Sequence, residues 1–224
     1  MADSPVVAQA RLIYEQFQAD HLAATPLSQM TDWIASGAPP PAETLRAFGF
    51  VTAEAANAAD LRWARKAFIR AWGYAIPCAE AVAALRAHGP LLEVGCGSAY
   101  WTALLCNAGV DCIATDAASG HSAYGFEVGQ YAPAEQLTAA QAIEGRPERN
   151  LFCAWPDPGQ PWIADAVRLM QPGRIIALIL DERPAVTGDA GLIATLDEVC
   201  APAGAVIIPQ FPRVQDRLVI YRRV

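Results

Sequence analysis

The sequence carries few charges of either sign and lacks a run of basic residues. Its 224 residues include 16 Lys and Arg against 23 Asp and Glu, which gives a formal net charge of −7. The basic residues form no run longer than short pairs such as Arg222-Arg223. Proteins that bind nucleic acid instead gather positive charge along the path of the phosphates. The charge balance therefore argues against a nucleic-acid partner.

Long apolar runs and paired cysteine motifs are also missing. The run "RIIALIL" at 174–180 has the length of a strand, whereas a membrane span needs ~20 apolar residues. The opening "MADSPVVAQARLIYEQF" carries an early acid and no long apolar core, unlike a signal peptide. The six cysteines show neither CxxC nor CxxxH spacing. We therefore expect a cytoplasmic protein with reduced cysteines, no membrane partner and no metal site.

Apolar residues, by contrast, are abundant. They make up 54% of the chain, enough for one large domain or for one domain with an extension. Up to about residue 72 they recur at helical spacing, and the consecutive prolines of "SGAPPPAET" interrupt the helices. We therefore expect a helical N-terminal extension or lid at 1–72 and a ligand-binding domain at 73–224. The extension is also a candidate surface for a homodimer.

After Gly89, strand-length apolar runs alternate with helical stretches. The runs are "PLLEVG", "DCIATD", "NLFCAW", "RIIALILDE", "GAVIIPQF" and "RLVIYRR". This alternation predicts an α/β fold with a mainly parallel sheet covered on both faces. Only "PRVQD" separates the last two runs, which is too short for a crossover helix, so we expect an antiparallel last strand. A further, faint strand is expected at "AEQLT" (134–138).

The stretch "EVGCGSAYW" (93–101) leads from a strand into a helix through a glycine turn. Glu93 lies at the strand end, and the turn is Gly95-Cys96-Gly97. Glycines let the backbone approach a ligand, and a helix N-terminus presents free amide groups. Asp116, followed by Ala117, ends the next strand, where a carboxylate can accept both hydroxyls of a ribose. The pattern predicts a nucleotide-type site at the carboxyl edge of the sheet.

Two details separate the cofactors that such a site binds. A dinucleotide site needs a third glycine at position 100, where Tyr100 would obstruct the pyrophosphate. Glu93 would also face that pyrophosphate with like charge, whereas it suits a ligand with an ammonium group. S-adenosylmethionine combines a ribose, an amino-acid ammonium and a sulfonium. We therefore predict it as the cofactor.

The residues from Glu93 to Ala99 resemble the first motif of class I S-adenosylmethionine-dependent methyltransferases, E/D-x-G-x-G-x-G. Ala99 replaces the third glycine, a mild departure if it already belongs to the helix. From about Trp72 onward the chain also resembles a little-characterised group of small bacterial methyltransferase-like proteins, through "WGYAIP", "NLFCAWPDPG" and "IPQFPRVQDRLVIYRR". The resemblance implies a Rossmann-like, mainly parallel seven-stranded sheet with an antiparallel last strand, and methyl transfer as the default activity.

The strand end "AWPDP" lies where class I enzymes place the methyl group. Amino-group methyltransferases acting on adenine carry N/D-P-P-Y/F there, but Trp155 cannot accept a hydrogen bond from an amine. An indole face does attract a cation such as a sulfonium. Tyr74, Tyr100 and Trp101 would complete an aromatic lining, unless they belong to the core. We expect a small-molecule acceptor.

Methyl transfer depends mainly on alignment, and a general base is needed only for an alcohol or a phenol. The candidate bases are His121, which is otherwise a solvated loop residue, and Asp157, which is otherwise a turn residue. The long segment 117–135 is expected to close over the acceptor as a lid. The resemblance to class I enzymes also implies an acid after the third strand that contacts the adenine amino group. The segment "LTAAQAIEG" has alanines where that acid is expected, so Thr138 or a backbone carbonyl would replace it.

The predicted function is methyl transfer from S-adenosylmethionine to a small molecule. Two alternatives remain open. One keeps the cofactor but transfers or cyclises its aminocarboxypropyl group, and the other is a non-catalytic binding or structural module on the same fold.

Overall fold

The computed structural model describes residues 69, 73–118, 130–181, 183, 186–210 and 214–224. The predicted helical extension at 1–72 lies outside the described residues apart from Ile69, so the division near residue 72 stays a prediction. His121 and most of the predicted lid at 117–135 also lie outside them.

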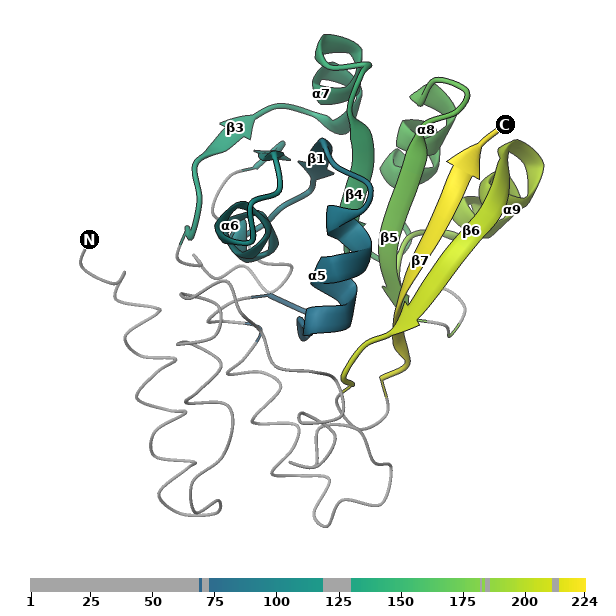
Figure 1. Cartoon of the computed structure of the whole chain (residues 1–224). Helices are drawn as coiled ribbons and strands as arrows, with labels where there is room; N and C mark the ends of the chain where they lie inside the picture. Colours follow the sequence, from purple (N-terminus) through teal and green to yellow (C-terminus); the bar gives the residue numbers. More distant parts are fainter. Residues whose placement is uncertain (1–68, 70–72, 119–129, 182, 184–185, 211–213) are drawn as a thin grey trace.

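The sheet has seven strands in the order β3-β2-β1-β4-β5-β7-β6 (Figure 1). The strands β3, β2, β1, β4 and β5 run parallel, and β7 is antiparallel to both of its neighbours, β5 and β6. The predicted Rossmann-like α/β fold is therefore confirmed, and the faint strand expected at 134–138 is β3. The strands are β1 (Leu91–Val94), β2 (Cys112–Asp116), β3 (Ala134–Gln136), β4 (Asn150–Ala154), β5 (Ile175–Asp181), β6 (Cys200–Ile207) and β7 (Asp216–Arg223).

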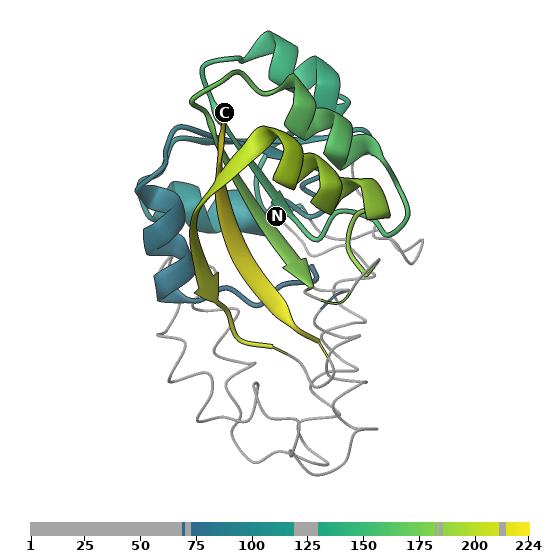
Figure 2. The ribbon, with the colours of Figure 1, turned by 90° about the vertical axis from the view of Figure 1, so that its right-hand side faces the viewer.

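Helices cover both faces of the sheet, as Figure 2 shows. One face carries α5 (Ala79–Arg86) and α6 (Tyr100–Asn107), and the other carries α7 (Ala139–Gly145), α8 (Trp162–Leu169) and α9 (Ala190–Val199). Because both faces are covered, every residue of the inner strand β5 is buried. None of the helices in the described ranges has the length and apolarity needed to cross a membrane.

The connections create a crevice beside β1. From β1 the chain proceeds outward to β2 and β3, and it then returns to β4 on the other side of β1. The segments that leave β1 and β4 therefore diverge onto opposite faces of the sheet. In open α/β sheets, ligands bind at the carboxyl ends of the strands at such a switch point.

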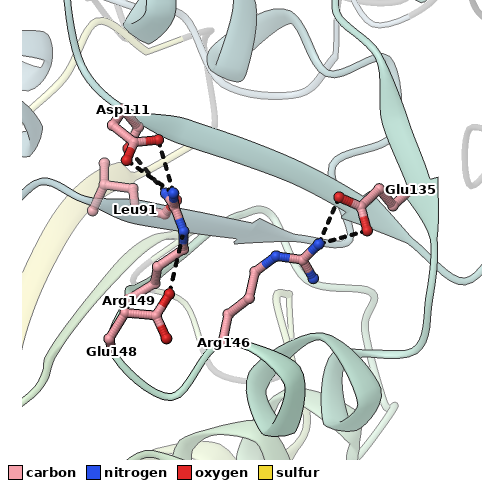
Figure 3. Close-up of polar contacts among 6 residues, drawn as sticks. All are labelled: Leu91, Asp111, Glu135, Arg146, Glu148 and Arg149. Atoms are coloured by element: carbon pink, nitrogen blue, oxygen red, sulfur yellow. Dashed lines mark hydrogen bonds and ion pairs between the residues drawn. The ribbon is translucent and has the colours of Figure 1, made fainter.

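Arginine side chains tie the amino ends of the strands together, on the edge opposite this crevice (Figure 3). Arg149 donates to both carboxylate oxygens of Asp111, at 2.9 and 2.8 Å, and to the carbonyl of Leu91 at 3.0 Å. Arg146 pairs with Glu135 at 2.6 Å and so connects the end of α7 with β3. These contacts support the sheet and leave the carboxyl edge to a ligand.

Asn150 connects two further strand starts at the same edge. Its amide nitrogen donates to the carbonyl of His88 at 2.7 Å, and its amide oxygen accepts from the backbone N–H of Ile175 at 2.8 Å. Because Ile175 is buried, its N–H has no access to water as a substitute acceptor.

We expect Asn150→Ala to lower the free energy of unfolding by about 1–3 kcal/mol, because the buried N–H of Ile175 loses its acceptor. Urea unfolding followed by circular dichroism measures the change. Asn150→Asp keeps the acceptor for Ile175 but places a carboxylate oxygen against the carbonyl of His88, so it should also lower stability. An unfolding free energy that is unchanged in the alanine variant would contradict this account of the edge.

Candidate functional site

A cavity of about 610 Å³ opens at the carboxyl ends of β1, β2 and β4. Its wall contains each predicted site residue that the structure describes. These residues are Tyr74, Glu93, Gly95, Cys96, Gly97, Tyr100, Trp101, Asp116, Ala117, Thr138, Trp155 and Asp157. His121 falls in the part of the chain that is not described. The structure thus gathers the predicted residues around one cavity, while their individual roles stay predictions.

The wall also includes residues that the sequence analysis did not single out. They are Ile69, Gly73, Ser98, Ala118, Leu137, Ala139, Ala154, Pro158, Gln160 and Trp162. Most adjoin a predicted residue along the chain. Trp162 had no such signal, because it opens α8 and reaches the site only through packing. A Cβ atom at Gly95 would lie 2.8 Å from Cη2 of Trp162, so the indole occupies the space that this glycine leaves.

The glycine turn depends on left-handed backbone conformations. Gly95, Gly97 and Ala99 have φ angles of 63°, 54° and 56°, and the N–H of Ala99 bonds to the carbonyl of Cys96 at 2.9 Å. The condition under which Ala99 would be a mild departure, that it already belongs to the helix, is not met, because α6 begins at Tyr100. The third position of the motif completes the turn, where a glycine would adopt this conformation at less cost.

Asp116 joins the tip of β2 to the glycine turn. Its Oδ2 accepts from the N–H of Gly97 at 2.8 Å, and its Oδ1 accepts from the N–H of Ala118 at 2.9 Å. An ionised carboxylate has about four acceptor positions. Each oxygen therefore retains capacity for one further donor, such as one of a pair of ligand hydroxyls.

Glu93 lies buried beneath the turn, with 1% of its surface exposed. Its Oε2 accepts from the backbone N–H of Thr102 at 3.0 Å and from the Thr102 hydroxyl. Burial raises the pKa of Glu93 to about 7; the bonds from Thr102 oppose this shift, and the charge of Asp116 adds to it. A cation bound in the cavity would favour the ionised form of Glu93.

The charged side chains among the described lining residues are all carboxylates. They belong to Glu93, Asp116 and Asp157. Partial burial, and then the charge of Asp116, raises the pKa of Asp157. Such a wall favours a ligand that carries positive charge and disfavours a phosphate. Within the described ranges no group of three or more His, Cys, Asp or Glu side chains could hold a metal ion.

Tyr100 and Trp101 support the cavity from the core side. Tyr100 is 3% exposed, and its hydroxyl donates to the carbonyl of Ala75. Its ring occupies the space that a side chain at Gly73 would need, since a Cβ there would lie 2.5 Å from Cε1. Burial also raises the pKa of Tyr100 well above its usual value, so the hydroxyl stays protonated. Trp101 is fully buried and packs edge-on against Phe152, with ring centroids 5.7 Å apart.

Trp155 and Tyr74 form the more exposed aromatic part of the wall. Their rings stack at a centroid distance of 5.0 Å and an interplanar angle of 11°. Trp155 follows β4 directly and has a φ of 60°, a conformation that turns the chain away from the sheet. Both residues line the cavity, and an aromatic ring face attracts a cation.

Thr138 is the N-cap residue of α7 and lines the cavity. It forms a capping box with Gln141: the Gln141 N–H donates to Oγ1 of Thr138 at 3.3 Å, and the Thr138 N–H donates to Oε1 of Gln141 at 3.0 Å. The hydroxyl is therefore used to cap the helix. Its neighbours Leu137 and Ala139 supply apolar lining, and contact of Thr138 with an adenine stays a prediction.

A matched pair of glycine variants tests whether a ligand approaches the turn closely. A Cβ atom meets nothing within 4 Å at Gly97 or at Gly109, and both residues have a positive φ. Either change to alanine should therefore lower stability by about 1 kcal/mol through backbone strain. Only Gly97 lines the cavity. We expect Gly97→Ala to weaken ligand binding severalfold and Gly109→Ala to leave it unchanged, as measured by calorimetry; equal affinities would remove the turn from the binding surface.

No protein-family profile and no curated protein matches the chain. Solved structures similar to it include magnesium protoporphyrin IX methyltransferase from Synechocystis PCC 6803 with bound S-adenosylmethionine, at 17% identity and a TM-score of 0.44, over 65% of this chain and 77% of that one. Precorrin-6y C5,15-methyltransferase from Geobacter metallireducens GS-15 has 15% identity and a TM-score of 0.43, over 68% and 92%. The N-methyltransferase NodS from Bradyrhizobium japonicum WM9 has 15% identity and a TM-score of 0.37, over 59% and 84%. Likenesses this distant carry no argument about the activity of this chain.

Proposed function

We propose that the protein binds S-adenosylmethionine in this cavity and transfers its methyl group to a small-molecule acceptor. The observation that carries the proposal is the wall itself, in which a glycine turn lies between two strand-tip carboxylates and the described charges are all negative. A ligand with a ribose, an ammonium and a sulfonium matches each of these features.

The fit assigns a part of the cofactor to each side of the cavity. The two acceptor positions that Asp116 retains would hold the ribose hydroxyls. Glu93 would face the ammonium group, which explains why a carboxylate is kept in a buried position where its pKa is raised. The aromatic surface of Tyr74 and Trp155 would lie against the sulfonium.

When bound, the cofactor supplies an electrophilic methyl group. The chain contributes alignment of the acceptor and exclusion of water, which are the main requirements of an in-line displacement. Asp157 would take the proton from an alcohol or a phenol, since its raised pKa brings it closer to the range of a general base. An acceptor that is already an anion or a free amine needs no such step.

Calorimetry on the full chain with S-adenosylmethionine and S-adenosylhomocysteine tests the binding step. Incubation with panels of amines, thiols, phenols and alcohols, followed by mass spectrometry, tests the chemistry. Formation of S-adenosylhomocysteine together with a methylated acceptor supports methyl transfer. Methylthioadenosine would instead show that the aminocarboxypropyl group leaves the sulfur. A wild-type protein that binds neither ligand would overturn the proposal.

A further inference from the structure

Three elements of the fold fix the orientation of Trp155. Its backbone N–H bonds to the carbonyl of Ile179 in β5 at 2.9 Å. Its indole Nε1–H donates to Oδ1 of Asp216 in β7 at 2.7 Å, and its ring stacks on Tyr74 from the segment before α5. The indole of the cavity wall is therefore held both at its edge and at its face.

Asp216 is a buried carboxylate that does not itself line the cavity. It is 1% exposed and is the first residue of β7. Its backbone carbonyl accepts from the side-chain amide of Gln210 at 2.8 Å, which anchors this end of the strand. Burying a carboxylate is unfavourable unless donors compensate for the lost water, so its bond to the indole has a large effect on both groups.

The neighbouring strand tip carries a second buried carboxylate with different partners. Asp181 lies opposite Asp216 in the antiparallel register of β5 and β7. It pairs with the guanidinium of Arg183 at 2.6 Å and accepts from the N–H of Gln215 at 3.2 Å. Asp181 thus binds Arg183 in its own loop and the backbone just before β7, whereas Asp216 reaches the cavity wall through Trp155.

Resting on the function proposed above, we propose that Asp216 is a positioning residue through which Trp155 recognises the positive charge of the sulfonium. The bond fixes the indole at the wall, and the carboxylate polarises the N–H so that electron density on the ring increases. The ring then attracts a cation more strongly. S-adenosylhomocysteine lacks the sulfonium charge, so the same wall favours the donor over its product.

Calorimetry with S-adenosylmethionine and S-adenosylhomocysteine on Asp216→Asn, Trp155→Phe and the double variant tests this. Each single change should lower the affinity for S-adenosylmethionine about tenfold and that for S-adenosylhomocysteine less than about threefold. Because the carboxylate acts through the indole, the double variant should resemble either single variant. Additive losses in the double variant, or equal losses for both ligands, would overturn the inference.

Asp181→Asn is the matched control, since it removes a second buried carboxylate from the same pair of strand tips. It should lower the melting temperature and leave the ratio of the two affinities unchanged. If Asp216→Asn does not fold, the test rests on Trp155→Phe. An unchanged ratio of the affinities for S-adenosylmethionine and S-adenosylhomocysteine in that variant would count against the inference. If the wild-type protein binds neither ligand, the proposed function itself is contradicted. If the variants bind both ligands with the wild-type ratio of affinities, only the role of Asp216 and Trp155 is contradicted.

Discussion

Replacing Asp116 by alanine is expected to weaken the binding of S-adenosylmethionine on the order of a hundredfold or more, because two hydrogen bonds from a ribose to a charged acceptor are lost. The variant also releases the N–H groups of Gly97 and Ala118, so the glycine turn loses its connection to β2. Asp116→Asn keeps one acceptor oxygen, so its affinity for S-adenosylmethionine should lie between those of Asp116→Ala and the wild type. Calorimetry measures all three proteins.

Asp111→Ala is the matched control for this prediction. Asp111 precedes the opposite end of the same strand and pairs with Arg149, far from the cavity. Its removal should leave the affinity unchanged and lower stability, since the mostly buried Arg149 loses a bidentate partner. Methylthioadenosine, which has the ribose but no ammonium group, should also bind the Asp116 variants weakly. If Asp116→Ala bound either ligand as tightly as the wild type, the ribose would have to lie elsewhere.

Replacing Glu93 by glutamine is expected to stabilise the protein above neutral pH by roughly 3 kcal/mol. The pKa of Glu93 is about 7 in the folded protein against an ordinary value of 4.5. Between these values the unfolded chain has lost the proton that the folded chain keeps, so the stability of the wild type falls as the pH rises. Glutamine does not titrate, and its oxygen still accepts from Thr102.

The two proteins should therefore be equally stable below about pH 4.5, diverge up to about pH 7 and keep a constant difference above it. Chemical unfolding at a series of pH values measures this difference. The same variant should bind S-adenosylmethionine at least tenfold more weakly, since a charge-assisted bond to the ammonium is lost. Its affinity for methylthioadenosine should not change. A constant stability difference at all pH values would show that Glu93 does not titrate in this window.

Glu93→Gln is thus expected to raise stability but to weaken binding of S-adenosylmethionine, and these opposite effects bear on function. A buried carboxylate with a raised pKa reduces stability at neutral pH, and such groups cluster at functional sites. Thr102 alone does not require an acid, because glutamine could accept the same bonds. A carboxylate at position 93, where glutamine would serve the fold as well, fits the cationic ligand proposed above.

Local patterns were sufficient for most of the sheet. Continuous apolar runs predicted the parallel strands, and the short "PRVQD" connection predicted the antiparallel pairing of β6 with β7, which the structure confirms. The start of β6 was less readable: it begins at Cys200, earlier than the run "GAVIIPQF", because residues 201–205 are exposed or partly exposed at the sheet edge and carry no burial pattern. The conformation of Ala99 could not be predicted, since an alanine gives no local sign of a left-handed backbone.

The amino-acid order by itself determined the alternation of strands and helices, the glycine turn and the carboxylates at two strand ends, because periodicity and turn chemistry act over a few residues. Only the tertiary structure decided that Trp162 fills the space beside Gly95 and that Asp216, 61 residues beyond Trp155, holds its indole. Contacts between distant segments arise when strands pair and helices pack, and no local pattern encodes them. The stacking of Tyr74 on Trp155 is of this second kind.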